Sequence, residues 1–258
     1  MGILNYTPDS FSDGGMYFTH EKALEHALLM QEQGADIIDI GANSTRPDAE
    51  ILSASEEKER LVPVLEAICG NVTAAVSVDT FYPDCAEAAL RAGADIINDV
   101  SGAFNSEIAK LAAEYGAGYV VMHNPCGSSD VAHYPDGVVA ELRKFFVEAI
   151  ELAAKYGLPK SQLCLDPGFG FGKSYNDNLE ILRNMQWLRF KGIALLAACS
   201  RKRFIGEASG EKNSALRDSG TVAANTAAIM GGADIIRVHD VFSAVQGARV
   251  ADEIYRKA

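Results

Sequence analysis

One pentapeptide, Gly-Ala-Asp-Ile-Ile, occurs three times in the chain, at residues 34–38, 93–97 and 232–236. Each copy follows a helix-like segment and opens a short apolar run that ends in polar residues, such as Asp39 after the first copy. Glycine often ends a helix in the left-handed conformation, and a run rich in β-branched residues is typical of a strand buried on both faces. The predicted unit is therefore a helix, a glycine stop, a buried strand and a polar strand end.

The rest of the chain repeats this unit with other residues, and no linker-like stretch interrupts it. The apolar runs predict strands at 2–5, 37–40, 75–79, 96–98, 119–123, 163–166, 193–198 and 235–238. Helices are expected at 21–33, 55–69, from Pro83 onward, and at 107–115, 138–156, 176–188, 216–230 and 243–256. Alternating strands and helices predict parallel strands joined by right-handed crossovers. Eight such pairs favour an α/β fold with a closed (β/α)8 TIM barrel, a single domain over residues 1–258; the alternative is an open doubly wound sheet.

Charge and cysteine usage narrow the class of partner and the compartment. The formal net charge of −12 disfavours binding to nucleic acid or to an anionic membrane. No apolar run approaches the roughly 20 residues of a membrane span, and the N-terminus lacks the pattern of a signal peptide. The five cysteines are scattered, without metal-like spacing. They are expected to be structural, reduced thiols, so a cytoplasmic location is predicted.

Polar residues gather where the predicted strands end, and in a closed barrel these positions meet at one mouth. Asp79, Asn98 and Asp166 are rich in hydrogen-bond acceptors and follow the third, fourth and sixth strands. They suit a neutral ligand with several N–H donors, such as a pterin or purine ring, because buried carboxylates need partners. The alternative is that each one caps a helix or a turn.

A cationic set follows the last two strands: Ser200-Arg201-Lys202, Arg237 and His239. Barrels often bind phosphate at this place. The alternative is that Arg201 and Lys202 lie on a solvated helix face and that Arg237 pairs with an aspartate. No paired histidines support a zinc site, and His123 and His239 are each open to a role as ligand, acid or core residue.

Two loops are candidates for ligand contact. Residues 166–173 read Asp-Pro-Gly-Phe-Gly-Phe-Gly-Lys, which has neither the spacing of a Walker loop nor that of a dinucleotide fingerprint. Its glycines would let the backbone approach a ligand beside an aromatic ring; the alternative is a tight turn with two core phenylalanines. Residues 6–15 form a candidate lid, in which Asp13 could meet Mg²⁺ or substrate; the alternative is a surface loop.

Taken together, these motifs resemble the dihydropteroate synthase family of pterin-binding enzymes. They occur in order along nearly the whole chain. The matching stretches are MGILNYTPDSFSDGG at 1–15, STRP at 44–47, SVDT at 77–80, IIND at 96–99, LDPGFGFGK at 165–173, SRK at 200–202 and IIRVHDV at 235–241.

The resemblance implies a TIM barrel that forms a homodimer and uses Mg²⁺. It implies condensation of 6-hydroxymethyl-7,8-dihydropterin pyrophosphate with p-aminobenzoate to give 7,8-dihydropteroate and pyrophosphate. By the family's pattern, Lys202, Arg237, His239 and Asp79 are the catalytic residues. Ligand roles follow the same pattern: Asp79, Asn98, Met122, Asp166 and Lys202 for the pterin; Asn5, Arg237 and His239 for the pyrophosphate, Asn5 also serving Mg²⁺; Thr45, Arg46, Pro47, Phe171 and Ser200 for p-aminobenzoate.

The chain departs from the family's pattern at three places. The family's GGESTRPG is replaced at 41–48 by a sequence with Ala42, Asn43 and Asp48, Ala198 stands in the seventh strand, and the ExxxG-type start of a late helix becomes 216–220. Two alternatives therefore remain: a paralogue that binds pterin without making dihydropteroate, and a pterin-dependent methyltransferase that serves a corrinoid protein and shares the barrel.

Overall fold

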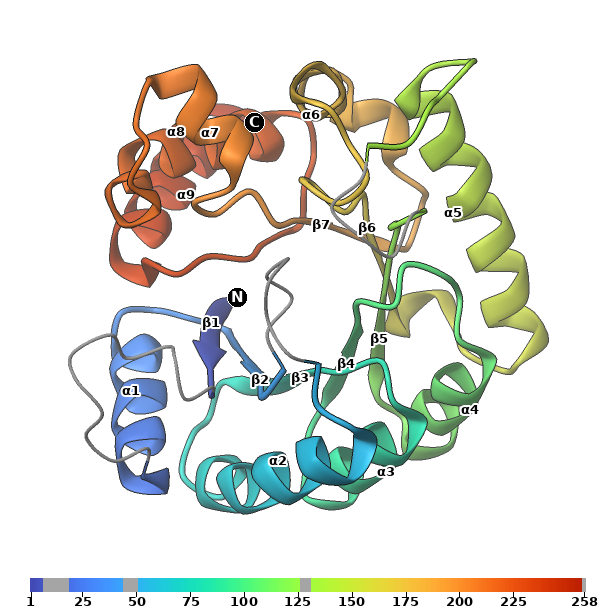
Figure 1. The fold of residues 1–258 in the computed structure, drawn as a ribbon, viewed down its shortest axis with the longest axis vertical. Coiled ribbons are helices and arrows are strands. Elements are labelled where there is room, and N and C mark those ends of the chain that lie inside the picture. The colour runs from blue at the N-terminus through green and yellow to red at the C-terminus, as the bar shows by residue number, and fades with distance from the viewer. Residues whose placement is uncertain (7–18, 44–50, 126–130, 257–258) are drawn as a thin grey trace.

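The protein is an eight-stranded parallel barrel surrounded by helices (Figure 1). The structure, a computed structural model, describes residues 1–6, 19–43, 51–125 and 131–256. Within these residues the strands run in the order β1 to β8, each paired in parallel with the next. Their bounds are β1 Gly2–Asn5, β2 Ile37–Gly41, β3 Ala75–Asp79, β4 Ile96–Asp99, β5 Gly118–Met122, β6 Leu163–Asp166, β7 Ala194–Ala197 and β8 Ile235–Ile236.

The sheet closes on itself just beyond β8. The Ile3 N–H donates to the Val238 carbonyl at 2.9 Å, and the Val238 N–H donates to the Met1 carbonyl at 2.9 Å. The Arg237 N–H still pairs with the Ala197 carbonyl of β7. The predicted closed barrel in a single α/β domain is therefore confirmed, in preference to the open doubly wound sheet.

The helices form a ring outside the strands (Figure 1). Their bounds are α1 His20–Glu32, α2 Ala54–Cys69, α3 Pro83–Arg91, α4 Ser106–Tyr115, α5 Val138–Lys155, α6 Tyr175–Arg183, α7 Arg203–Ser209, α8 Asp218–Met230 and α9 Val241–Tyr255, with short 3-10 turns at Lys160–Gln162, Met185–Leu188 and Ser214–Leu216.

Two helical predictions were incomplete. The segment predicted as one helix over 176–188 is α6 followed by a 3-10 turn, because Asn184 breaks the regular backbone and its side chain donates to the Glu180 carbonyl at 2.8 Å. The helix α7 was not predicted. It has seven residues and ends at Gly210 in the left-handed conformation, too short for a periodic pattern to be recognised.

The repeated pentapeptide acts at the start of three strands. Gly34, Gly93 and Gly232 have φ of +100°, +103° and +93°, as expected for glycines that end a helix. The aspartate of the second copy, Asp95, accepts the Val76 N–H at 2.8 Å. That of the third copy, Asp234, accepts the Leu195 N–H at 2.9 Å. The repeat therefore ends a helix in all three copies, and in the second and third copies its aspartate also accepts a backbone N–H of the preceding strand.

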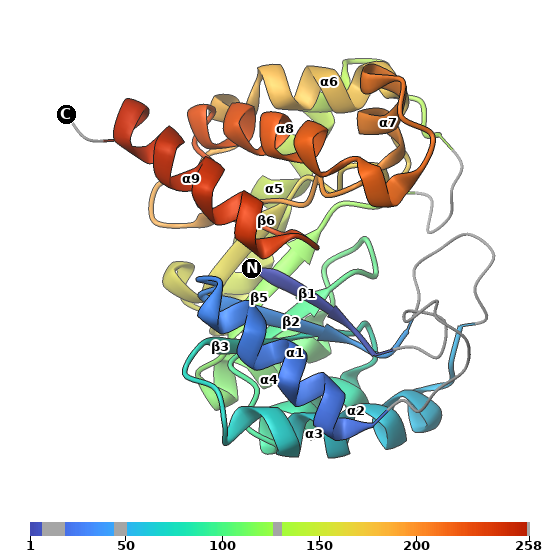
Figure 2. The same ribbon diagram turned by 90° about the vertical axis from the view of Figure 1, so that its left-hand side faces the viewer.

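The barrel interior is closed by apolar side chains. A cluster of Met1, Val120, Cys164, Leu196 and Ala198 is buried there, separate from the larger core between strands and helices. Polar residues such as Asp79, Asn98 and Asp166 stand instead at or next to the carboxyl ends of the strands. These strand ends lie on the right-hand side of the barrel in Figure 2, where α7 also lies. A ligand therefore has polar partners at that end. Over the described ranges, no helix is long and apolar enough to cross a membrane.

Candidate active site

The predicted site residues converge on the carboxyl end of the barrel. Strand register places Asn5 beside Gly41, Gly41 beside Asp79, Asp79 beside Asn98, and Met122 beside Asp166. These residues therefore all lie at or next to the carboxyl ends of their strands. Ser200 and Lys202 follow β7, and Arg237 and His239 follow β8. The sequence-based prediction of a common rim is borne out for these nine positions.

Asp39 makes three side-chain hydrogen bonds within the polar network, although no role was predicted for it from the sequence. It lies inside β2 and is fully buried. Its Oδ1 accepts the Ser77 hydroxyl at 2.6 Å, and its Oδ2 accepts Asn98 Nδ2 at 3.0 Å and Arg237 Nε at 2.6 Å. A charged residue within a run buried on both faces needs partners. That feature of the Ile-Asp-Ile sequence could have identified it.

Arg237 bridges two carboxylates across the barrel. Besides Asp39, it contacts Asp79 with 2.9 Å between Nη2 and Oδ2. Burial works to lower the pKa of Arg237, but Asp39 and Asp79 outweigh it and the pKa is raised. Burial raises the pKa of Asp79 to about 7, Arg237 opposes that rise, and the charge of Asp39 adds to it. The expectation that Arg237 pairs with an aspartate, given as the alternative to phosphate binding, is therefore met in this structure.

Half-buried Lys202 and buried Asp166 form a second acid–base region. Lys202 Nζ donates to the Phe169 carbonyl and lies 4.4 Å from the centre of the Phe171 ring. Burial lowers the pKa of Lys202 to about 8, and the charge of Asp166 opposes this. Burial likewise raises the pKa of Asp166, and Lys202 is the largest opposing influence. Each charge thus offsets part of the other's desolvation.

The glycine loop after β6 is fixed by close contacts. Gly168 has φ of +67°, and a Cβ added there would lie 2.1 Å from the His123 carbonyl oxygen, so a larger residue cannot fit. Buried Lys173 donates to the carbonyls of His123 at 3.1 Å and Phe171 at 2.8 Å. Phe169 is a fully buried core residue, whereas Phe171 is half-buried beside Lys202. Phe169 is therefore a core residue, as the alternative predicted, whereas Phe171 is not, and ligand contact by this loop stays a prediction.

The two candidate histidines, His123 and His239, differ in their surroundings. His123 is buried, and its Nδ1 lies 3.1 Å from Lys173 Nζ. Burial, then Lys173, lowers the pKa of His123 to about 3. His239 Nδ1 lies 2.8 Å from Ser200 Oγ, which accepts the His239 backbone N–H at 3.1 Å. Burial, then Arg201 and Arg237, lowers the pKa of His239 to about 4. The Ser200 hydroxyl can thus donate to Nδ1 of a neutral imidazole, which leaves its N–H on Nε2.

Arg201 has an unusual backbone. Among the residues that the structure describes, it is the only non-glycine residue with positive φ, at 57°. A left-handed backbone costs about 1–2 kcal/mol for such a residue. Its guanidinium forms two contacts of 2.7 Å with Asp218. The predicted cationic set is therefore partly compensated by carboxylates, at Arg201 and at Arg237.

Three residues that the resemblance assigns to p-aminobenzoate, Thr45, Arg46 and Pro47, lie outside the described residues. So do Asp48 and residues 7–15 of the predicted lid, which include Asp13. The residues that flank 44–50 are described. Asn43 Oδ1 accepts the Leu52 N–H at 2.9 Å, and Asn43 Nδ2 donates to fully buried Glu57. Tyr82 donates to the Leu52 carbonyl at 2.9 Å. The departure at Asn43 thus joins the two ends of this segment, and the departure at Ala198 packs into the interior cluster.

Among the described residues of this rim, a metal would find few protein ligands. The part of the chain that the structure describes holds no group of three or more His, Cys, Asp or Glu placed for a metal ion. Half-buried Asn5 ends β1 at the same level as the acceptor residues. Mg²⁺ commonly takes few protein oxygens and completes its shell with water and substrate phosphates. Asn5 fits that mode of binding, not a dedicated cage.

The chain is also similar to known proteins in sequence and in fold. Residues 1–239 match the family model described as pterin binding enzyme. The chain is 44% identical over 260 residues to a dihydropteroate synthase of Synechocystis, covering 99% of this chain and 90% of that protein. A solved Xanthomonas albilineans dihydropteroate synthase with 4-aminobenzoic acid has a TM-score of 0.93 at 43% identity, covering 100% and 93% of the two chains. The Thermus thermophilus enzyme in complex with 6HMPPP has a TM-score of 0.85 at 42% identity, covering 99% and 93%.

Proposed function

The chain belongs to the family of pterin-binding enzymes, and we propose that it is a dihydropteroate synthase. It condenses 6-hydroxymethyl-7,8-dihydropterin pyrophosphate with p-aminobenzoate and releases pyrophosphate. The observation that carries this proposal is the joint placement of Asp39, Asp79, Asn98 and Arg237 in one hydrogen-bonded network at the carboxyl end of the barrel. Acceptors for a ring and a cation for a leaving group thus meet there.

The acceptor residues are suited to the pterin. Asp79, Asn98 and Asp166 present carboxylate and amide oxygens to the N–H groups of the ring, and Lys202 donates to its acceptors. Met122 is buried at the end of β5 beside the glycine loop, where an added Cβ at Gly168 would lie 3.2 Å from its Cγ. Its polarizable side chain can pack on the ring.

The pyrophosphate faces Arg237, His239 and Asn5. Arg237 offers a planar set of donors for phosphate oxygens, and His239 presents an N–H from Nε2 in the tautomer that Ser200 favours. Asn5 would hold Mg²⁺ together with the substrate's phosphates, and the bound ion would neutralise the charge of the leaving group. Engagement of Arg237 by phosphate would weaken its contact with Asp79, so the carboxylate would turn to the ring.

The p-aminobenzoate lies between the mouth and the pterin. Phe171 offers an aromatic face beside Lys202, and Ser200 lies next to His239. We assign Thr45, Arg46 and Pro47 to the same substrate, from the STRP motif. Asn43 supports this assignment because it joins the two ends of the segment that carries them.

The reaction needs no protein nucleophile. The amine nitrogen of p-aminobenzoate bonds to the methylene carbon of the pterin as the C–O bond breaks, and pyrophosphate leaves with the electron pair. The nitrogen then loses one proton. Positive charge spreads from the methylene into the ring, where Asp79 and Asp166 stabilise it, while Arg237 and His239 stabilise the leaving group. Prearranged charges of this kind are the largest contributor to many enzymes' rates.

The decisive experiment mixes the protein with Mg²⁺, pterin pyrophosphate and p-aminobenzoate and measures pyrophosphate release and dihydropteroate. We expect turnover in the wild type and its loss in Lys202→Ala and Arg237→Ala, with Glu87→Gln on exposed α3 as the control. Full turnover in both site variants would refute the assigned roles. Calorimetric binding of the pterin substrate without turnover would favour the paralogue, and methyl transfer to a corrinoid protein would favour the methyltransferase.

We propose further that the enzyme is a homodimer in the cytoplasm. The helices α8 and α9 lie side by side (Figure 2) and expose Met230, Phe242, Val250 and Ile254. Such an apolar surface supports a protein interface, and free cysteines at 69, 85, 164 and 199 support a reducing compartment. Light scattering would give the dimer's mass, and a Phe242→Glu variant should shift it toward the monomer.

A further inference from the structure

The link between β7 and α7 is a tight turn with a residue that is unusual there. The Lys202 N–H donates to the Cys199 carbonyl at 3.2 Å, which closes a four-residue turn from Cys199 to Lys202. Arg201 is the third residue of the turn, with φ of 57°. Positive φ at this position normally selects glycine or asparagine. An arginine there must be held by contacts from outside the turn.

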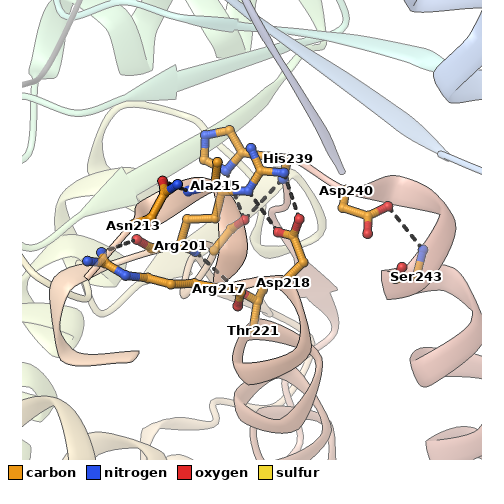
Figure 3. Close-up of polar contacts among 10 residues, drawn as sticks. Arg201, Asn213, Ala215, Arg217, Asp218, Thr221, His239, Asp240 and Ser243 are labelled. Atoms are coloured by element: carbon orange, nitrogen blue, oxygen red, sulfur yellow. Dashed lines mark hydrogen bonds and ion pairs between the residues drawn. The ribbon is translucent and has the colours of Figure 1, made fainter. Parts of the chain in front are cut away.

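Those contacts all come from the start of α8. Asp218 accepts Arg201 Nε and Nη2, each at 2.7 Å. Thr221 Oγ1 accepts the Arg201 backbone N–H at 3.0 Å, and Arg217 Nη1 donates to the Arg201 carbonyl at 2.9 Å. Figure 3 shows these side chains gathered around Arg201, with His239 beside it. The side chain, the N–H and the carbonyl of one residue are thus bound by three residues of one helical turn.

Arg217, one of these three residues, is itself held by other parts of the fold. Arg217 Nε donates to the Glu211 carbonyl at 3.0 Å, and its Nη2 donates to the Lys212 carbonyl at 2.7 Å. It also lies against α7, because a Cβ added at Gly206 would be 2.4 Å from Arg217 Nε. The Arg201–Asp218 pair is only partly exposed, at 30% and 26% of the two side chains. This pair therefore differs from a mobile surface ion pair.

Both neighbours of Arg201 reach the site. Ser200 Oγ lies 2.8 Å from His239 Nδ1, and Lys202 Nζ lies 4.4 Å from the Phe171 ring centre. If φ at residue 201 turned negative, the chain between them would change direction, and the two side chains could not keep both contacts. The backbone conformation of Arg201 thus determines where the side chains of both Ser200 and Lys202 lie.

We propose that Arg217, Asp218 and Thr221 at the start of α8 clamp Arg201 in the left-handed conformation, and that Asp218 is thereby a positioning residue for Ser200 and Lys202. This inference rests on the proposed function of those two residues. Arg201 acts through its backbone conformation, and its guanidinium serves to bind Asp218, which keeps that conformation in place. The competing role for Arg201 is direct contact of its guanidinium with substrate.

Glycine at position 201 separates the two roles, because glycine adopts positive φ without a clamp. We expect Asp218→Ala and Arg201→Ala each to lower kcat/KM about tenfold, whereas Arg201→Gly stays within about twofold of the wild type. In the Arg201→Gly background, Asp218→Ala should have no further effect. Glu87→Gln is the matched control, since Glu87 pairs with Arg91 at 2.5 Å on the exposed face of α3.

Loss of activity in Arg201→Gly to the level of Arg201→Ala would overturn the proposal and assign the guanidinium to substrate. Equal effects of Asp218→Ala in both backgrounds would also overturn it. Thermal unfolding of each variant checks the fold, and Arg201→Asn, which tolerates positive φ, replaces the glycine variant should that one unfold. A crystal structure of Asp218→Ala should show negative φ at residue 201. This last readout tests the clamp even if the wild type shows no synthase turnover, a result that would refute the function instead.

Discussion

Replacing Asp39 by Asn should destabilise the protein strongly while keeping the shape of the side chain. Asp39 is fully buried and accepts three hydrogen bonds, from Ser77, Asn98 and Arg237. Asn carries no charge, and its amide group would place a donor against another donor. The variant thus leaves Arg237, whose side chain is 18% exposed, with Asp79 as its remaining carboxylate in the network.

The size of the expected loss in the free energy of unfolding depends on Asp79, the carboxylate that still pairs with Arg237. Removing one member of a buried ion pair costs about 3–5 kcal/mol. Asp79, at 2.9 Å from Arg237, offsets part of this loss, and without the repulsion of Asp39 its own pKa falls. We therefore expect the lower end, a loss of about 3 kcal/mol in the free energy of unfolding. For a chain of this size that corresponds to a fall in Tm of roughly 6–12 °C.

Thermal unfolding followed by circular dichroism at pH 7 measures this change. Glu87→Gln removes a carboxylate from an exposed pair and should shift the free energy by less than about 1 kcal/mol. A double-mutant cycle with Arg237→Gln should show that the paired loss is smaller than the sum of the single losses. If Asp39→Asn unfolds at the temperature of the control, or if the two losses simply add, the network does not hold the barrel rim together as argued.

Three further outcomes are expected. The raised pKa of Asp79 means that the native protein keeps a proton which the unfolded chain loses above pH 3.8. The stability that this proton contributes is therefore lost as pH rises from 3.8 to about 7, at about 1.4 kcal/mol per pH unit. Asp79→Asn should flatten this fall, and an unchanged pH profile of unfolding would contradict the prediction. Gly168→Ala should lose roughly 2–4 kcal/mol in chemical denaturation, from a left-handed backbone and a clash, while Gly157→Ala, with φ of +83° and no atom within 4 Å, should lose only the backbone part. Ser200→Ala should lower kcat/KM roughly tenfold and change the His239 tautomer seen by nitrogen NMR; an unaltered spectrum would show that Ser200 does not set it.

The elements of the fold could be predicted because their signals are local. A glycine stop, a β-branched run and a polar strand end recur within each unit, and the helical faces repeat over short windows. Strand-end residues such as Asp79 and Asp166 could be placed on one rim from topology alone. The short α7 and the 3-10 turn after α6 escaped, since a seven-residue helix and an asparagine break leave no periodic pattern.

The sequence by itself thus determined the barrel and the level at which its polar residues lie, because the hydrophobic pattern and the turn residues act between near neighbours. Only the tertiary structure decided which of those residues form hydrogen bonds and ion pairs with one another. Arg237 is 198 residues from Asp39 and 158 from Asp79 in the sequence. No local sequence pattern therefore predicts that its guanidinium pairs with those two carboxylates. The strained backbone of Arg201 was equally hidden, because the first turn of α8 that stabilises it is a separate element brought alongside by closure of the barrel.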